Sequence, residues 1–270
     1  MDSNAIARPI IRCQQKQLAF ERQARALGLR PNDPWVGGYL DYEWEHLRLV
    51  LDAMPLHLPG MAVLEFGCNV GASAILLAHL GARVCATDIS AGWVELARLN
   101  AERYGIGDID FLHVPDSRRL PFADSQFQLI ACNSVLEYVA PEQLPAVQRE
   151  LDRVLAPGGL LLLSGTSNRL WPREAHTERW LINYLPRTWQ PSAQRGIWPW
   201  TARHSFGAHY DNLDTAGADH FFARSRRRMG ASPSRLLPLL WLARALRVGP
   251  GLLTHNLSCL LRKRRQHQQG

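Results

Sequence analysis

The sequence predicts an α/β protein built on a Rossmann-like, mainly parallel sheet with helices on both faces. Short apolar runs alternate with helical patterns from Met61 onward, a glycine-containing turn follows the first run, and an acidic residue ends the second. Strands that alternate with helices form parallel sheets, because each helix returns the chain to the same end of the sheet. Such sheets bind ligands at the carboxyl ends of their strands.

Two helices are expected ahead of this sheet. Residues 10–30 carry scattered apolar side chains among Gln, Arg and Lys, which favours a mostly polar helix ended by Gly28 and Pro31. Residues 41–53 place apolar side chains three and four positions apart, which predicts an amphipathic helix. We therefore expect residues 1–44 to form an N-terminal helical arm.

The elements of the sheet are expected within a core domain at residues 45–165. The predicted strands span 62–66, 83–88, 109–114, 127–133 and 160–164. The predicted helices run up to residue 80, over 90–104 and over 141–155. The turn residues agree, because Gly81 and Gly105 each follow a helix and Ser90 can cap the start of the next.

The composition changes after Thr166 to tryptophan, proline, arginine and histidine. We expect residues 166–250 to form a cap or acceptor-binding region, and 251–270 the last strand and a basic tail. The apolar segment 234–248 is expected to be a cap helix buried against the sheet. The alternative is an interfacial segment that reaches a lipidic acceptor.

Composition and charge restrict the possible functions. With 46% hydrophobic and 20% charged residues, the chain is globular rather than disordered or fibrous. The net charge of +7 comes largely from two clusters, which contain Arg224, Arg226, Arg227 and Arg228, and Arg262, Lys263, Arg264 and Arg265. We interpret them as solvated surface or tail, so nucleic acid is not the expected partner. Peripheral membrane contact through 234–265 is the alternative.

The cysteines and the apolar stretches bear on location. The five cysteines are odd in number and include no CxxC pair, which predicts a reduced compartment. No stretch approaches the about 18 uninterrupted apolar residues of a membrane-spanning helix, and the N-terminus lacks the apolar core of a signal peptide. The sequence therefore predicts a cytoplasmic protein and leaves the oligomeric state open.

A candidate cofactor site follows the first strand. The run Val63-Leu-Glu-Phe-Gly-Cys-Asn-Val-Gly71 ends that strand with an acid and turns through two glycines, which let the backbone pass close to a ligand. Asn69 takes the middle position of the turn, and Asn tolerates the left-handed conformation. Asp88 ends the next strand, where its carboxylate can accept both hydroxyls of a ribose. These features alone fit either S-adenosylmethionine (SAM) or a nicotinamide dinucleotide.

Further motifs follow in order along about 105 residues. They are Asp116-Ser-Arg-Arg-Leu-Pro-Phe122, Phe127-Gln-Leu-Ile-Ala-Cys-Asn133, Val135-Leu-Glu-Tyr-Val139 and Pro157-Gly-Gly159. In order and spacing the chain resembles the class I SAM-dependent methyltransferases, in particular the bacterial small-molecule and glycan type with a methyltransferase type 11-like domain. Gln128 replaces the acid common after the aromatic residue, and Tyr138 replaces a frequent histidine, so that histidine's family role is not expected here.

The resemblance implies SAM as cofactor and assigns roles to the matching residues. The amino-acid end of SAM would meet Glu65, Gly67, Cys68, Asn69 and Gly71, the ribose Asp88, the adenine Ile89, the adenine amino group Asp116 and Ser117, and the methionyl portion Asn133. No metal site is expected. Glu137 is interpreted as a helix-surface acid.

The acceptor is expected to meet the segment that follows the fifth strand. Ser167-Asn-Arg-Leu-Trp-Pro-Arg-Glu-Ala-His-Thr177, with Trp180 beyond it, resembles a segment of methyltransferases often associated with glycan or lipid-linked modification. We hypothesise that Glu174 and His176 contact the acceptor and that one acts as a base. Trp171 and Trp180 would be apolar walls. The alternative is that Glu174 and His176 only hold the loop by hydrogen bonds to backbone.

The expected reaction is transfer of the methyl group of SAM to oxygen or nitrogen of a small molecule, glycan or lipid-linked intermediate. Two alternatives remain at this point. A nicotinamide-dependent oxidoreductase would place Ala72 at the sixth position of the dinucleotide motif, but leaves the Asp116 and Pro157-Gly-Gly159 motifs unexplained. A SAM-binding protein without catalysis is the other.

Overall fold

The structure is a computed structural model that describes residues 6–186, 188–189, 194–204, 206, 209–214 and 221–265, without the side chains of 202–204. Residue contacts divide the chain into two compact units, 1–116 and 117–270. This division differs from the four segments 1–44, 45–165, 166–250 and 251–270, which stay a prediction.

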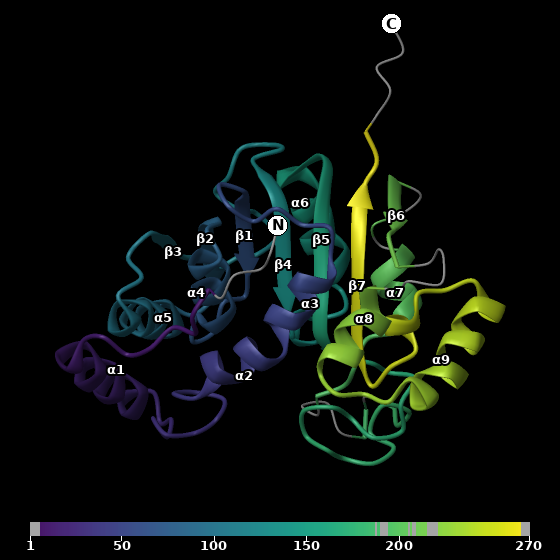
Figure 1. Cartoon of the computed structure of the whole chain (residues 1–270), viewed down its shortest axis with the longest axis horizontal. Helices are drawn as coiled ribbons and strands as arrows, with labels where there is room; N and C mark the ends of the chain where they lie inside the picture. Colours follow the sequence, from purple (N-terminus) through teal and green to yellow (C-terminus); the bar gives the residue numbers. More distant parts are fainter. Residues whose placement is uncertain are drawn as a thin grey trace, which may run out of the picture. The chain divides into compact units, whose positions relative to one another are not determined.

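The first unit contains a parallel sheet with the strand order β3-β2-β1. Its strands are β1 (Ala62–Phe66), β2 (Arg83–Asp88) and β3 (Ile109–His113), joined by helices α4 (Ala72–His79) and α5 (Ala91–Tyr104), as Figure 1 shows. Helix α4 buries six of its eight residues, which explains why it is apolar on every side. The predicted elements of this region are confirmed to within a residue or two.

The helices ahead of this sheet are α1 (Gln14–Ala26), α2 (Tyr39–Glu45) and α3 (Leu47–Ala53). The first was predicted, but the single helix predicted over 41–53 is wrong, because the chain leaves the helical conformation at His46, with φ −120° and ψ −70°. The His46 ring stacks on Tyr42 at 3.9 Å between centroids, and its Nδ1 lies 2.8 Å from the Tyr42 carbonyl oxygen. The His46 side chain thus contacts the Tyr42 carbonyl oxygen, which is also an acceptor for the backbone N–H groups of the helix.

A buried arginine joins the N-terminal helices to the sheet. Arg103 of α5 is 1% exposed and donates to Asn100 Oδ1 at 2.7 Å, Gln17 Oε1 at 2.8 Å and the Gly37 carbonyl at 2.9 Å. Its guanidinium lies over the Phe20 ring, 3.9 Å from the centroid. Burial lowers the pKa of Arg103. The N-terminal arm is therefore an integral part of the first unit.

The second unit has the strand order β4-β5-β7-β6. Its strands are β4 (Phe127–Asn133), β5 (Leu155–Ser167), β6 (Tyr210–Asn212) and β7 (Asn256–Lys263). Strands β4 and β5 are parallel, whereas β7 runs antiparallel to β5 and to β6 (Figure 1). The expected fifth and last strands are confirmed. The fifth is longer at both ends, because Leu155 pairs with Phe127 of β4 and β7 pairs with β5 as far as Ser167.

The helix predicted over 141–155 is shorter than expected. The helix there, α6, spans Leu144–Val154, and a separate 3-10 turn, η1 (Leu136–Tyr138), lies ahead of it. Helix α6 has Pro145 in its first turn, where a missing N–H costs no helical hydrogen bond. The mainly parallel strands with their helices confirm the predicted Rossmann-like α/β class.

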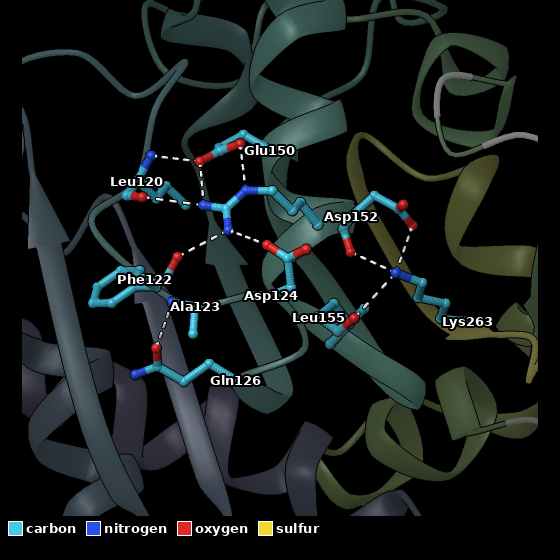
Figure 2. Close-up of polar contacts among 10 residues, drawn as sticks. Leu120, Phe122, Ala123, Asp124, Gln126, Glu150, Asp152, Leu155 and Lys263 are labelled. Atoms are coloured by element: carbon cyan, nitrogen blue, oxygen red, sulfur yellow. Dashed lines mark hydrogen bonds and ion pairs between the residues drawn. The ribbon is translucent and has the colours of Figure 1, made fainter.

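Arg153 of α6 attaches the Leu-Pro-Phe loop (Figure 2). It donates to the carbonyls of Leu120 and Phe122 at 3.1 and 2.9 Å and pairs with Asp124 and Glu150, both at 2.6 Å. Glu150 also accepts the Leu120 N–H at 2.7 Å. The motif that contributes to the family resemblance is therefore a loop clamped onto a helix.

The rest of the second unit contains α7 (Pro199–His204), α8 (Phe221–Arg228), α9 (Pro233–Leu246) and the 3-10 turn η3 (Pro250–Leu252). Helix α9 buries Leu236 and Ala243 but leaves Leu237 63% and Trp241 73% exposed. The expectation of a cap helix buried against the sheet is therefore wrong, since its apolar residues lie on every side of the helix and the packing covers one. Among the described residues, no helix is long and apolar enough to cross a membrane.

Candidate active site

The turn after β1 has the backbone conformation of a ligand-binding loop. Gly67, Asn69 and Gly71 have φ of 77°, 50° and 76°, in the left-handed region. The Gly67 N–H donates to the Thr87 carbonyl at 2.9 Å, which ties the turn to the end of β2. A Cβ atom at Gly71 would lie 2.9 Å from the Cβ of Ala97. Glycine at position 71 is therefore required both by its φ and by close packing against α5.

Asp88 organises the same edge of the sheet. Its Oδ2 accepts the N–H of Asn69 at 3.0 Å, and its Oδ1 accepts the N–H of Ser90 at 2.9 Å. Each carboxylate oxygen can accept a second hydrogen bond, so a ribose diol still has two acceptors here. Ile89 beside it is an exposed apolar side chain, which suits contact with a planar base.

Glu65 is a buried acid with an unmet hydrogen bond. Glu65 is 2% exposed, and its Oε2 atom has no hydrogen-bond partner among the described residues. Burial, and then the charge of Glu43, raise the pKa of Glu65, against a hydrogen bond from Ser73. An ammonium group would supply both the missing donor and a counter-charge, so the site fits the amino-acid end of SAM.

The other predicted cofactor residues lie in several places. Cys68 is buried in the glycine turn, and Asp116 is exposed after β3. Ser117 opens the second unit. Asn133 ends β4, where its Oδ1 accepts the Ser164 hydroxyl at 3.1 Å. The cofactor roles of these residues remain predictions.

Glu137 is a residue of the candidate site that the sequence analysis missed. Its side chain is fully buried, and its Oε1 lies 2.8 Å from His176 Nε2 and accepts the Ser167 N–H at 3.2 Å. The interpretation as a helix-surface acid is therefore wrong, because η1 turns the side chain inward. The available signal was its position four residues beyond the carboxyl end of β4.

His176 combines a buried acid partner with access to solvent. Burial would lower the pKa of His176, but the hydrogen bond and charge of Glu137 outweigh it and raise the pKa above its ordinary value. Its side chain remains 28% exposed. The ring of Tyr138 lies 5.9 Å from the His176 ring and is itself exposed. His176 and Tyr138 thus present a titratable nitrogen beside an aromatic surface.

Glu174, the other predicted catalytic residue, is occupied by its own loop. Its Oε2 accepts the N–H groups of His176 and Thr177 at 2.9 and 2.6 Å and the Thr177 hydroxyl at 2.8 Å. Burial would raise the pKa of Glu174, but hydrogen bonds from Thr177 and Ser167 outweigh it and lower the pKa. The geometry supports the loop-holding alternative for Glu174 and leaves His176 as the candidate base.

The two tryptophans predicted as apolar walls are both exposed. Trp171 is held in place, because its Nε1 donates to the Leu253 carbonyl at 3.1 Å and its ring lies 5.7 Å from that of His255. Trp180 forms an isolated antiparallel β-bridge with Arg173. Their contact with an acceptor remains a prediction.

Comparison with known proteins gives the family. A methyltransferase domain model matches residues 63–159. The chain is 30% identical over 187 residues to the ubiquinone biosynthesis O-methyltransferase of Cereibacter sphaeroides, which covers 67% of this chain and 70% of that relative.

Two solved structures share the fold. The SAM-dependent methyltransferase of Mesorhizobium loti is 16% identical with a TM-score of 0.54, over 83% of this chain and all (100%) of that one. The phosphoethanolamine N-methyltransferase 1 of Haemonchus contortus is 15% identical with a TM-score of 0.55, over 96% of this chain and 51% of that one.

The parallel sheet with an acid and a left-handed glycine turn at the end of β1 defines a Rossmann-like cofactor-binding enzyme. With the sequence relative, the assignment becomes specific: the chain belongs to the class I SAM-dependent methyltransferases. SAM is the methyl donor of that family. This assignment decides against the nicotinamide-dependent oxidoreductase and against a binding protein without catalysis.

Proposed function

We propose that this methyltransferase acts on a hydroxyl oxygen of a small, apolar or aromatic acceptor, with His176 as general base. The observation that carries the proposal is the 2.8 Å contact between His176 Nε2 and the buried Glu137 Oε1. A hydroxyl must lose its proton as it accepts a methyl group, whereas many other nucleophiles need no base. The sequence relative in Cereibacter sphaeroides is named an O-methyltransferase, which supports oxygen as the acceptor atom.

The proposed proton path follows from the tautomer of His176. With Nε2 donating to Glu137, the acceptor nitrogen on the neutral ring is Nδ1. As its oxygen accepted the methyl group that bound SAM would supply, the acceptor hydroxyl would give its proton to Nδ1. Glu137 stabilises the imidazolium that results and acts as a positioning residue.

The proposed cofactor residues lie in the first unit. Bound SAM supplies an electrophilic methyl group on a sulfonium. Glu65 and the turn Gly67–Gly71 would hold its amino-acid end, while Asp88 and Ile89 would orient the nucleoside. Alignment of nucleophile, methyl and sulfur provides most of the rate enhancement in such a displacement.

The C-terminal region supports an apolar acceptor, drawn from a lipid surface rather than a glycan. Leu237, Trp241 and Leu246 are exposed along α9. Residues 221–265 contain eleven Lys and Arg residues and no acid. A basic segment that contains a helix with exposed Leu and Trp suits an anionic membrane surface. All five cysteines are free thiols, which is consistent with a proposed cytoplasmic location.

The test measures release of S-adenosylhomocysteine from SAM with a phenol and an aniline panel of matched ring substituents. We expect turnover of phenols, and a fall in kcat of about a hundredfold for His176→Ala. The Kd of S-adenosylhomocysteine should stay unchanged, whereas the thermal midpoint should fall, because the buried Glu137 carboxylate loses its partner. Methylation confined to the anilines, or full kcat in His176→Ala, would contradict the proposal.

A further inference from the structure

Helix α9 exposes an apolar side to solvent. Four of its apolar side chains are between 43% and 73% exposed, those of Leu237, Trp241, Leu242 and Leu246. The set consists of two pairs spaced four residues apart, which form neighbouring rows along one side of the helix. Leu236 and Ala243, the buried residues of α9, lie on the opposite side. The helix therefore packs by one side and leaves an apolar side uncovered.

The chain around this apolar side is basic. Arg235, Arg244 and Arg247 are exposed on α9 and at its C-terminal end. Helix α8 ends in three further arginines, and residues 221–265 contain no acid. Two copies of such a surface repel one another, whereas a layer of lipid phosphates attracts it. The charge thus favours an anionic membrane over a second copy of this chain as the partner.

The length of α9 and its side chains indicate how it would meet a membrane. Helix α9 has 14 residues, fewer than the about 20 that a membrane-spanning helix needs. A helix with an apolar side and exposed arginines instead lies in the plane of the membrane surface. Trp241 is the most exposed apolar residue of α9, and tryptophan is the residue type enriched at the level of the lipid headgroups.

The turn that follows α9 is hydrogen-bonded to the segment 167–177, here called the acceptor segment, which carries the candidate base. Helix α9 leads through η3 into strand β7 (Figure 1). Asn168 Nδ2 donates to the Leu252 carbonyl at 3.0 Å, and Trp171 Nε1 donates to the Leu253 carbonyl at 3.1 Å. Asn168 is fully buried, so water does not compete for its hydrogen bond. The acceptor segment and the turn after α9 are therefore held together within the second unit.

We propose that α9 docks on an anionic membrane and that the turn after it presents the acceptor segment to that membrane. The apolar side of α9 lies among the acyl chains, and its arginines lie at the lipid phosphates. The presentation of the acceptor segment rests on the proposed function, because it requires an apolar hydroxyl acceptor dissolved in the bilayer. The docking itself rests on α9 alone.

The first experiment is flotation of the full chain with vesicles of phosphatidylcholine alone or of equal parts phosphatidylcholine and phosphatidylglycerol. We expect binding to the anionic vesicles only, weakened by high salt. Leu237→Ser combined with Trp241→Ser should reduce that binding about tenfold or more, because less apolar area enters the bilayer. Ile10→Ser combined with Leu18→Ser changes two exposed apolar residues of the first unit and should bind like the unaltered protein.

A charge-reversal variant tests the same docking if the Leu237→Ser, Trp241→Ser variant does not fold. Arg235→Glu combined with Arg244→Glu reverses two exposed charges of α9 and should weaken binding to the anionic vesicles about tenfold or more. Binding equal to that of the unaltered protein would overturn the docking.

The second experiment links docking to turnover. Release of S-adenosylhomocysteine is measured with a phenol in solution and with a phenol bearing a long alkyl chain, carried in the anionic vesicles. The Leu237→Ser, Trp241→Ser variant should methylate the soluble phenol at the rate of the unaltered protein. Its turnover of the vesicle-borne phenol should fall about tenfold, in step with its vesicle binding.

The outcomes separate this inference from the proposed function. Docking is overturned if both kinds of vesicle bind equally, or if the serine variant floats as well as the unaltered protein. It is also overturned if the unaltered protein binds no vesicles, whether or not it forms a dimer that the serine variant dissociates. Loss of vesicle binding with unchanged turnover of the vesicle-borne phenol overturns the presentation of the acceptor segment. Turnover of neither phenol by the unaltered protein rejects the proposed function, while flotation still decides the docking.

Discussion

The Nε2 atom of His176 lies 2.8 Å from the Oε1 atom of Glu137, a residue 39 positions earlier in the chain. The contact joins the turn after β4 to the segment after β5, and it turns an exposed histidine into a candidate base with a buried counter-charge. The contact leads to two predictions, one for the pH dependence of turnover and one for the pH dependence of stability.

Replacing Glu137 should change the pH dependence of turnover. A histidine base must be neutral, so kcat rises with pH through the pKa of His176, which Glu137 raises. Glu137→Gln should therefore shift the acidic limb of the kcat profile to lower pH and reduce kcat at pH 7 by about tenfold or more. Glu142→Gln, an exposed acid nearby in the chain, is the control. An unchanged acidic limb in Glu137→Gln would show that His176 is not the titrating base.

The same contact affects stability with the opposite dependence on pH. The pKa of His176 is raised in the folded state. The contact with Glu137 therefore stabilises the fold fully at pH values below the unfolded-state pKa of about 6.5, and this stabilisation is lost as pH rises through the folded-state pKa. The difference in thermal midpoint between the unaltered protein and Glu137→Gln should therefore shrink from pH 6 to pH 8. A difference that grows with pH would contradict this assignment.

Glu174 should matter for stability more than for chemistry. The Glu174 carboxylate accepts hydrogen bonds from two backbone N–H groups and a hydroxyl, and the neutral amide of Glu174→Gln is a weaker acceptor. The substitution should therefore lower the free energy of unfolding by about 2 kcal/mol, or the thermal midpoint by about 4–8 °C. Because the pKa of Glu174 is lowered, its contribution is present above the unfolded value of about 4.3 and is lost as pH falls through the folded pKa. Differential scanning calorimetry at pH 7 measures the effect. The exposed Glu178→Gln is the control, and a fall in kcat without loss of stability would restore a catalytic role to Glu174.

Asp88 should act on the nucleoside part of the cofactor. Asp88→Asn removes a charged acceptor for the ribose, so it should weaken S-adenosylhomocysteine and 5′-methylthioadenosine alike, by about ten- to a hundredfold. Calorimetry with both ligands measures the effect. Asp110→Asn, an exposed residue of β3, should leave both affinities unchanged. Selective loss of S-adenosylhomocysteine would instead assign Asp88 to the amino-acid end.

Arg103 should stabilise the first unit through its hydrogen bonds to the N-terminal helices. Arg103→Met keeps the apolar stem but leaves Gln17 and the Gly37 carbonyl without their donor, which should cost about 3 kcal/mol. Urea unfolding with a matched Arg22→Met variant, at an exposed position of α1, measures the difference. Equal midpoints for the two variants would mean that the buried arginine contributes little.

Local sequence patterns were sufficient to predict the strands, the glycine turn and the position of Asp88 at the end of a strand. Each depends on residues close in sequence: apolar runs set β1 and β2, and the turn residues at Gly67 and Asn69 define the loop between β1 and α4. The acid at the end of a parallel strand is expected at the ligand edge whatever the rest of the chain does. These features carried the family resemblance that the comparisons confirmed.

Only the tertiary structure decided which distant residues meet. Glu137 and His176 are 39 residues apart, Arg103 and Gln17 are 86 apart, and no periodicity relates either pair. The same limit applies to Glu43, which sequence alone presents as an ordinary charged helix residue, and to α9, whose apolar residues lie on every side of the helix and do not indicate which side is buried. Burial and partner are properties of the packed chain, so the sequence determined the type of site, and folding decided which side chains complete it.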